Sequence, residues 1–285
     1  MTDSARDDLI TFYDTHPINE DEILAKAAAS GKNLDALTQP DLQNLDQDHY
    51  GGTRVTDIIA EAAGIQREHH VLDVCSGMGG PARWLAYHRH CRVTGIDLTL
   101  SRVQSARRLT HRVKLQNLVD FVHGDATAMP LASSRYDVVI SQESWLHVPN
   151  KTALIAECTR VLKPTGTLAF TDVVVKAGFD AIAEARVTAD IHTSNLATAA
   201  QYRSLLESNG CEVQTEEDLS GEWRAVLLDR LQMYRSLRDT TEAKFGAEHF
   251  RTYDDGYSHF VNCFVEGKLG GVRMTARKAA TPLAL

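Results

Sequence analysis

The sequence predicts an α/β protein with a doubly wound, mostly parallel sheet. Short apolar runs alternate along the chain with helical patterns, as in parallel sheets whose crossover helices cover both faces. A second observation agrees: the apolar run at 71–75 leads into a glycine-rich turn and a helix. The next apolar run ends in Asp97, about 20 residues further on, which is the spacing of nucleoside-binding βαβ units.

The individual elements follow from the periodicity of apolar residues. Strands are expected at 70–75, 92–97, 119–123, 136–141 and 166–174, with helices at 80–89, 100–114 and 151–162 between them. Asn150 or Thr152 suits the start of the third of these helices, and Lys-Pro-Thr-Gly at 163–166 ends it. Further helices are expected at 20–30, 55–63, 178–193 and 198–209 and in the stretch up to about 268, with strands at 211–217 and 271–278.

The glycine-rich turn indicates the kind of ligand. Gly77 and Gly79 let the backbone pass close to a bound molecule, and the following helix presents free N–H groups. Asp97 at the tip of the second strand can accept hydrogen bonds from a ribose diol. The turn also fits a dinucleotide fingerprint, but Asp73 just before it would repel a pyrophosphate. The same acid suits S-adenosylmethionine, whose sulfonium and ammonium groups are positive, so this cofactor is the favoured ligand.

These motifs resemble those of the class I S-adenosylmethionine-dependent methyltransferases over about residues 66–173. Cys75 stands where that family usually has glycine, and we expect it to follow the strand in β conformation with a modest local adjustment. Residues 124–126 match the segment after the family's third strand, and residues 136–143 match its fourth strand. Residues 157–168 match the helix, turn and fifth strand that follow. The resemblance implies that the cofactor is held by Asp73, Cys75, Gly77, Gly79, Asp97, Leu98, Asp125, Ala126 and Gln142.

Two further segments are similar to small-molecule methyltransferases related to sarcosine and dimethylglycine N-methyltransferases. They are the His-Tyr-Gly-Gly stretch at 49–52 and the Ser-Gln-Glu-Ser-Trp-Leu-His stretch at 141–147. The resemblance implies a Rossmann-like, seven-stranded sheet whose last strand is antiparallel, with a helical lid and cap. It also implies the following organisation: lid segment at 1–60, cofactor-binding core at 61–176, helical cap at 177–210, the end of the sheet with helices at 211–278, and a tail at 279–285.

The chemistry requires in-line displacement at the sulfonium, which depends mainly on positioning and exclusion of water. The candidate catalytic residues are His147, Glu143 and Tyr50: His147 or Glu143 as a base for an acceptor that carries a proton, and Tyr50 in a segment that closes over the site. Tyr50 and Trp145 can offer aromatic faces to a cationic product, and His147 can also contact the substrate. Alternatives remain open: Trp145 packing between sheet and helix, His147 capping its loop, and Glu143 binding a substrate cation. A carboxylated acceptor would need an arginine, for which the candidates are Arg54, Arg186 and Arg203, while His192 can face either the pocket or solvent.

Composition limits the partners. The net charge of −8 over 285 residues argues against a nucleic-acid substrate, which usually requires a basic surface. The basic residues along 102–114 are interpreted as a solvated helix face. Five scattered cysteines indicate reduced thiols, and the histidines show no metal-ligand spacing. We therefore expect a cytoplasmic monomer or homodimer that acts on a small molecule and binds no metal or membrane.

Three functions are compatible with these features. The first is methyl transfer to the nitrogen of a small amine or amino acid such as sarcosine or dimethylglycine. The second is O- or C-methylation of a natural product, because one fold hosts many acceptors. The third is a non-catalytic nucleoside-binding protein, which the polar 142–143 pair and His147 disfavour. A DNA methyltransferase is disfavoured because the fourth strand lacks the Asn/Asp-Pro-Pro-aromatic element.

Overall fold

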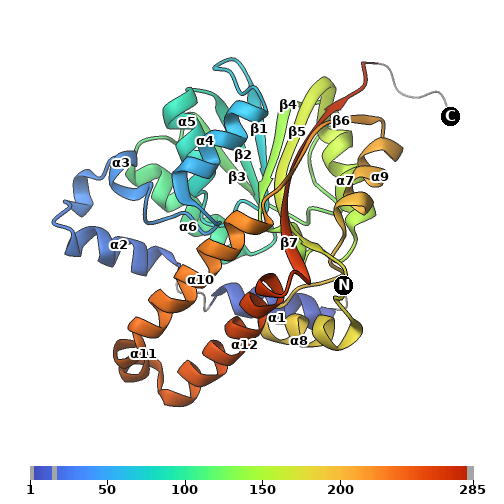
Figure 1. Ribbon diagram of the computed structural model, residues 1–285. Coiled ribbons are helices and arrows are strands. Elements are labelled where there is room, and N and C mark those ends of the chain that lie inside the picture. The colour runs from blue at the N-terminus through green and yellow to red at the C-terminus, as the bar shows by residue number, and fades with distance from the viewer. Residues whose placement is uncertain (1–2, 15–17, 281–285) are drawn as a thin grey trace.

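The computed structural model describes residues 3–14 and 18–280, and it contains a central seven-stranded sheet (Figure 1). The strand order is β3-β2-β1-β4-β5-β7-β6. The strands are β1 (His70–Val74), β2 (Arg92–Asp97), β3 (Val119–His123), β4 (Tyr136–Gln142), β5 (Leu162–Val175), β6 (Cys211–Asp218) and β7 (Leu269–Lys278). The predicted alternation of strands and helices through the core is therefore confirmed.

The helices fall into three groups by position. An N-terminal group comprises α1 (Asp3–Asp14), α2 (Glu20–Ala29), η1 (Leu34–Ala36) and α3 (Gln39–Leu42). The helices that cover the sheet are α4 (Gly52–Ala62), α5 (Gly80–Arg89), α6 (Leu100–Arg112), α7 (Lys151–Val161) and α9 (Ala199–Ser208). The remaining elements are η2 (Trp145–His147), α8 (Ala181–Ile191), α10 (Ser220–Ser236), α11 (Arg238–Phe245) and α12 (Ala247–Val265).

The sheet is parallel except for β7, as predicted for the last strand. β7 pairs antiparallel with β5 on one side and with β6 on the other, so it lies one place in from the edge. β5 begins at Leu162, four residues before the predicted strand, because Leu162 already pairs with Tyr136 of β4 across an irregular register. Asn150 begins α7 as predicted, since its side chain accepts a hydrogen bond from the Ala153 N–H.

Apolar side chains fill both faces of the sheet, and this packing fixes its edges in space. On one face α7 and α9 cover residues such as Val139 and Phe170, and on the other α4, α5 and α6 cover residues such as Val71 and Val93. The helices α1, α8, α10 and α12 lie at the end of the sheet where the parallel strands finish (Figure 1). Those helices cover the region in which ligands of open α/β sheets bind.

The N-terminal segment is attached to the core in two different ways. α2 and α3 share a buried cluster with Met78 of the glycine turn and Leu109 of α6. α1 and residues 46–50 instead reach over the carboxyl ends of the strands, where they meet side chains of β4, α6 and α10. The expected tail at 279–285 lies outside the described residues from 281 onward.

Two negative findings apply to the described residues. No helix within 3–14 and 18–280 is long and apolar enough to cross a membrane. No group of three His, Cys, Asp or Glu side chains in the same part of the chain is arranged to hold a metal ion.

Candidate functional site

The site lies where the strand order reverses, beyond the carboxyl ends of neighbouring strands. β1 pairs with β2 on one side and with β4 on the other, which makes this edge the switch point of the sheet. Asp73, Asp97 and Gln142 stand at the ends of these three strands. The fold therefore brings together polar residues that are separated by up to about 70 positions in the sequence.

The turn after β1 depends on backbone conformations that favour glycine. Gly77 and Gly79 have φ of 52° and 75°, in the left-handed region. A Cβ added at Gly79 would lie 2.3 Å from Cζ of Phe121, so a side chain there would force the ring to move. The Gly77 N–H donates a hydrogen bond to Oδ2 of Asp97 at 2.8 Å. This bond joins the turn directly to the end of β2.

Cys75 departs from the expected conformation. Its φ is 60°, in the left-handed region, whereas a β conformation was predicted. The backbone has the conformation that a glycine would adopt at this position. For a cysteine this conformation is less stable by about 1–2 kcal/mol. Its thiol is half-buried, and burial holds the pKa of that thiol well above its usual range.

Asp73 is a buried acid near the end of β1. It is 3% exposed, and its Oδ2 has no hydrogen-bond partner among the described residues. Burial, together with the nearby Asp97 charge, raises the pKa of the Asp73 carboxyl to about 8. An isolated buried carboxyl is costly unless a cation meets it. The orphaned oxygen therefore fits the ammonium group of S-adenosylmethionine.

Asp97 and Asp125 are held in place by backbone N–H groups. Oδ1 of Asp97 accepts from the Thr99 N–H at 2.9 Å, and each carboxylate oxygen keeps a second lone pair for a ribose hydroxyl. Oδ1 of Asp125 accepts from the N–H and the hydroxyl of Thr127, at 2.8 and 2.7 Å. The other oxygen of Asp125 remains available as an acceptor.

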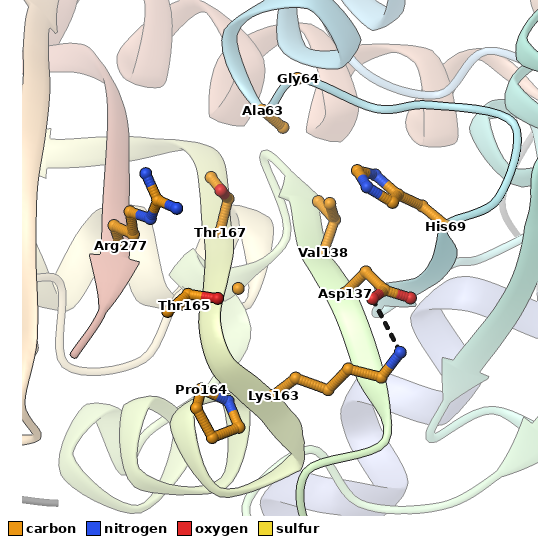
Figure 2. A pocket seen from close by; sticks show the side chains of 11 residues that line it. Ala63, Gly64, His69, Asp137, Val138, Lys163, Pro164, Thr165, Thr167 and Arg277 are labelled. Carbon is orange, nitrogen blue, oxygen red and sulfur yellow. Dashed lines mark hydrogen bonds and ion pairs between the residues drawn. The ribbon is translucent and has the colours of Figure 1, made fainter. Parts of the chain in front are cut away.

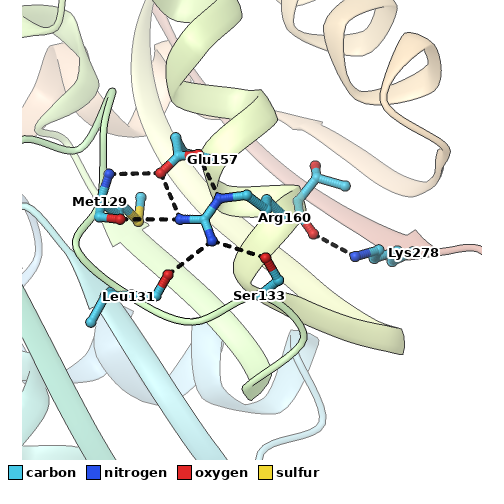
Figure 3. A network of polar contacts seen from close by, with 7 residues as sticks. Met129, Leu131, Ser133, Glu157, Arg160 and Lys278 are labelled. Atoms are coloured by element: carbon cyan, nitrogen blue, oxygen red, sulfur yellow. Dashed lines mark hydrogen bonds and ion pairs between the residues drawn. The ribbon is translucent and has the colours of Figure 1, made fainter.

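The loop that follows Asp125 is tied down by Arg160 of α7 (Figure 3). The guanidinium donates to the carbonyls of Met129 and Leu131 at 3.1 and 2.8 Å and pairs with Glu157 at 2.6 Å. Within this arrangement Ala126 is buried in the core, and Leu98 is half-buried after β2. The bonds of Arg160 thus restrain the loop after Asp125, on the side of the site where the sequence predicts adenine to bind.

Residues 46–50, which we call the clasp, lie across the glycine turn. Asp46 forms an ion pair with Arg83 of α5 at 2.8 Å, and both side chains are 0% exposed. Arg230 of α10 donates to the His49 carbonyl at 2.7 Å. Gln142 contacts Nδ1 of His49 at 3.2 Å, so this residue, which was predicted to contact the cofactor, also holds the clasp.

Glu143 joins the clasp to the sheet. Its Oε2 accepts from the Tyr50 N–H and its Oε1 from the Thr171 hydroxyl at 2.9 Å. Burial raises the pKa of the Glu143 carboxyl to about 8. The ring of Tyr50 lies between Trp223, with centroids 5.1 Å apart, and the Arg230 guanidinium, 4.9 Å from its centroid. Both residues therefore position the clasp.

His147 has the geometry of a proton acceptor. It ends η2, and its Nδ1 lies 2.9 Å from the His192 carbonyl oxygen. A carbonyl only accepts, so Nδ1 carries the proton and Nε2 keeps a lone pair. Burial, with a smaller contribution from the Lys151 charge, lowers the pKa of His147 to about 4. The ring is consequently neutral at physiological pH.

Trp145 is not at the site, which corrects its expected role as an aromatic face for substrate. It is 1% exposed and stacks on Phe170 with centroids 4.3 Å apart. The side chain points into the core between the sheet and α9, where Tyr202 also contacts it. The alternative packing role is the one observed.

The arginines considered for a substrate carboxylate are paired elsewhere. Arg54 pairs with Glu222, Arg186 with Asp255 at 2.9 Å, and Arg203 with Glu216 at 2.6 Å, all near the surface. The three arginines are therefore partly neutralised before any substrate arrives.

Sequence reasoning missed a group of residues that closes the site from the N-terminal side. Arg102 was interpreted as part of a solvated helix face, but it is 3% exposed. Its guanidinium lies 4.7 Å from the ring centroid of Tyr13 on α1 and 3.2 Å from Asp48. The Tyr13 ring is in turn 5.5 Å from that of His147. No sequence signal marked Tyr13, because its position depends on how α1 folds back over the sheet.

A separate pocket of about 500 Å³ lies at the opposite, amino-terminal edge of the strands (Figure 2). His69, Asp137, Lys163 and Arg277 line it, and Lys163 pairs with Asp137 at 2.7 Å. None of the residues assigned to the cofactor is among its walls.

Comparison with known proteins finds methyltransferases. A family model described as a methyltransferase domain matches residues 72–170. Methyltransferase GfsG of Streptomyces halstedii is 31% identical over 188 residues, which are 65% of this chain and 68% of that protein. Glycine/sarcosine/dimethylglycine N-methyltransferase of Actinopolyspora halophila is 30% identical over 70% of this chain and 35% of its own length. The 27-O-demethylrifamycin SV methyltransferase of Amycolatopsis mediterranei is 28% identical over 79% of this chain and 83% of its own.

A solved structure supports the fold. The crystal structure of a putative sarcosine dimethylglycine methyltransferase from Galdieria sulphuraria superposes with a TM-score of 0.75 at 22% identity. The match covers 81% of this chain and 86% of the other.

Proposed function

This chain belongs to the class I S-adenosylmethionine-dependent methyltransferases, and we propose that it methylates a hydroxyl oxygen of a small, uncharged acceptor with His147 as the base. The cofactor is S-adenosylmethionine, which supplies an electrophilic methyl group on a positively charged sulfur. What remains for the protein is to hold the two reactants in line and to remove the acceptor's proton.

The cofactor would be held by three carboxylates around the glycine turn. Asp73 suits the ammonium group because its buried Oδ2 has no hydrogen-bond partner in the part of the chain that the structure describes. Asp97 suits the ribose hydroxyls, and the second oxygen of Asp125 suits the adenine amino group. The clasp and α1 would form the lid over this site and exclude water from the sulfonium.

One observation carries the choice of acceptor: His147 is fixed with a proton on Nδ1 and a lone pair on Nε2. A hydroxyl is a poor nucleophile until its proton is removed, so it benefits from such a base. A low pKa keeps the imidazole neutral across the physiological range, so that its Nε2 lone pair is not occupied by a proton before the acceptor binds. The pairing of Arg54, Arg186 and Arg203 with carboxylates also favours an uncharged acceptor over an amino acid.

An amine acceptor, expected from the sequence, is the second candidate. The relative from Actinopolyspora halophila is named for glycine, sarcosine and dimethylglycine. Tyr253 and Tyr257 of α12 stack with ring centroids 5.7 Å apart, and aromatic faces of this kind bind ammonium groups. Asp48 adds a carboxylate on the same side. These features favour a tertiary or quaternary amine product if the acceptor is nitrogenous.

The test is a methyl-transfer screen with trideuteromethyl-labelled cofactor and mass-spectrometric detection. The panel contains phenols, sugar and macrolide hydroxyls, glycine, sarcosine, dimethylglycine and simple amines. Labelled ethers that disappear with His147→Gln but persist with His249→Gln, which changes an exposed histidine of α12, support the proposal. Labelled amines without ethers overturn it in favour of the second candidate, and a labelled carbon product overturns both.

A further inference from the structure

The turn that carries His147 rests on two buried charges that the reaction itself does not use. Asp172 of β5 is 0% exposed, and Lys151 at the start of α7 is 5% exposed. Removing charged groups from water is expensive unless their hydrogen-bonding capacity is used. Their contacts therefore indicate what these two side chains do.

Each charge holds one side of His147. Oδ1 of Asp172 accepts from the N–H of Leu146, the residue before His147, at 3.1 Å. The Lys151 ammonium donates to the carbonyl of Val148, the residue after His147. The turn is thus fixed through its backbone immediately on both sides of the imidazole.

The same lysine also holds the segment that orients the ring. The Lys151 ammonium donates to the Ser194 carbonyl at 3.0 Å, and the Ser194 N–H donates to the Leu146 carbonyl at 2.8 Å. Two residues earlier, the His192 carbonyl accepts the proton of His147 Nδ1. His192 has φ of 54°, so its carbonyl direction depends on an uncommon backbone conformation that neighbours must maintain.

We infer that Asp172 and Lys151 are positioning residues that hold His147 in the Nδ1–H tautomer and leave its Nε2 free to accept the acceptor's proton. Tyr202 of α9 completes the arrangement, because its hydroxyl donates to Oδ2 of Asp172 at 2.6 Å. The inference rests on the proposed function only in that His147 acts as the base. The positioning itself is a property of the protein without any acceptor.

The charges around His147 predict the sign of a change in its pKa. A general loss of stability would not predict that sign. The charged and titratable groups that face the ring are Lys151, His192, Asp48 and the nearby Tyr13. The Lys151 charge opposes protonation of the imidazole. Loss of that charge should raise the pKa of His147, and Lys151→Arg should retain it.

The experiment reads the tautomer directly by NMR of protein labelled with ¹⁵N in its histidine rings. His147→Gln assigns the signals at neutral pH. The wild type and Lys151→Arg should show one neutral tautomer, protonated at Nδ1. In Lys151→Met and Asp172→Asn we expect both tautomers, and in Lys151→Met a raised pKa of His147. Lys163→Met, which removes a half-exposed lysine beyond the other end of α7, is the matched control.

A milder pair of variants covers the case in which the buried charges are needed for folding. Tyr202→Phe removes one hydroxyl from Asp172, and Tyr234→Phe removes a buried hydroxyl that has no partner among the described residues. Tyr202→Phe should broaden or split the His147 signals, and Tyr234→Phe should not. With the acceptor from the screen, turnover of Lys151→Met should fall by about 10- to 100-fold at unchanged cofactor affinity.

Two outcomes separate this inference from the proposed function. If folded Lys151→Met, Asp172→Asn and Tyr202→Phe all keep a single Nδ1–H tautomer with an unchanged pKa, the positioning role is overturned. If the tautomer mixes as expected but His147→Gln turns over at the wild-type rate, the positioning role stands and the base role in the proposed function fails.

Discussion

The buried carboxyl of Asp73 should make cofactor binding depend on pH, and the size of the dependence can be worked out. Burial raises the pKa of this carboxyl to about 8 in the protein alone. The ammonium group of S-adenosylmethionine needs the ionised form beside it, so binding must first remove the proton. Affinity should therefore increase as the pH rises toward 8 and then level off.

The size of the effect follows from the pKa. At pH 7 about one Asp73 carboxyl in ten is ionised, and each pH unit below 8 costs about 1.4 kcal/mol, or tenfold in affinity. Between pH 6 and pH 8 the ionised fraction of Asp73 rises about 50-fold, so the dissociation constant should fall by the same factor, about 2.3 kcal/mol. Asp73→Asn removes the ionisable group, and with it a charge-assisted hydrogen bond worth about 1.5–3 kcal/mol.

Isothermal titration calorimetry of both proteins from pH 6 to pH 9 tests this reasoning. The cofactor's own ionisation is common to both proteins, so the ratio of their dissociation constants isolates Asp73. That ratio should widen as the pH rises from 6 to 8. Repeating the wild-type titration at pH 7 in buffers of different ionisation enthalpy should reveal release of about 0.9 proton from Asp73 beyond that seen with Asp73→Asn.

The matched control is Asp229→Asn, which changes an exposed carboxylate of α10 and should behave as the wild type. A ratio between wild type and Asp73→Asn that stays constant from pH 6 to pH 9 would refute the reasoning. It would mean that Asp73 is already ionised in the free protein or that it does not meet the ammonium group.

Three other perturbations have defined outcomes. His147→Gln should lower turnover of the acceptor by about 10²–10⁴-fold while calorimetry finds cofactor affinity within a factor of about two, and an unchanged rate would remove the base from the mechanism. Gly79→Ala places a Cβ 2.3 Å from Phe121, so urea unfolding should show a loss of about 1–3 kcal/mol, and a neutral result would contradict the close packing of the turn. Arg83→Met leaves the buried Asp46 charge without its ion-pair partner and should lower the free energy of unfolding by about 3–5 kcal/mol in the same measurement. The double variant with Asp46→Leu should recover part of that loss. If it recovers none, the loss does not come from the ion pair.

Several features of the site were predictable because they are encoded by residues close together in the chain. The strand that ends in Asp73, the turn through Gly77 and Gly79, and Asp97 at the next strand end form one local βαβ unit. Local apolar periodicity also placed the core strands within a few residues, apart from the early start of β5 at Leu162. Pairing with Tyr136 decided that start, and no local pattern reports a pairing partner.

Other features depended on contacts between distant segments. Cys75 adopts φ of 60° because its turn is pinned between β1 and the end of β2, and a residue's own preference does not reveal that constraint. Trp145 is an aromatic residue of a kind that can bind a substrate. Its stacking on Phe170 instead makes it part of the core. Tyr13 comes to lie near Arg102 and His147 only because α1 folds back over the strands.

The sequence by itself therefore determined the α/β class, the cofactor and the acids around the glycine turn. Their physical basis is local, since hydrophobic periodicity and backbone freedom act over a few residues. Only the tertiary structure decided the tautomer of His147 and the role of Glu143 in holding the clasp. Hydrogen bonds from Tyr50 and Thr171 to Glu143, and from His147 to His192, join segments up to 93 residues apart. Such bonds exist only once the chain has packed, because burial and partner geometry set both protonation and orientation.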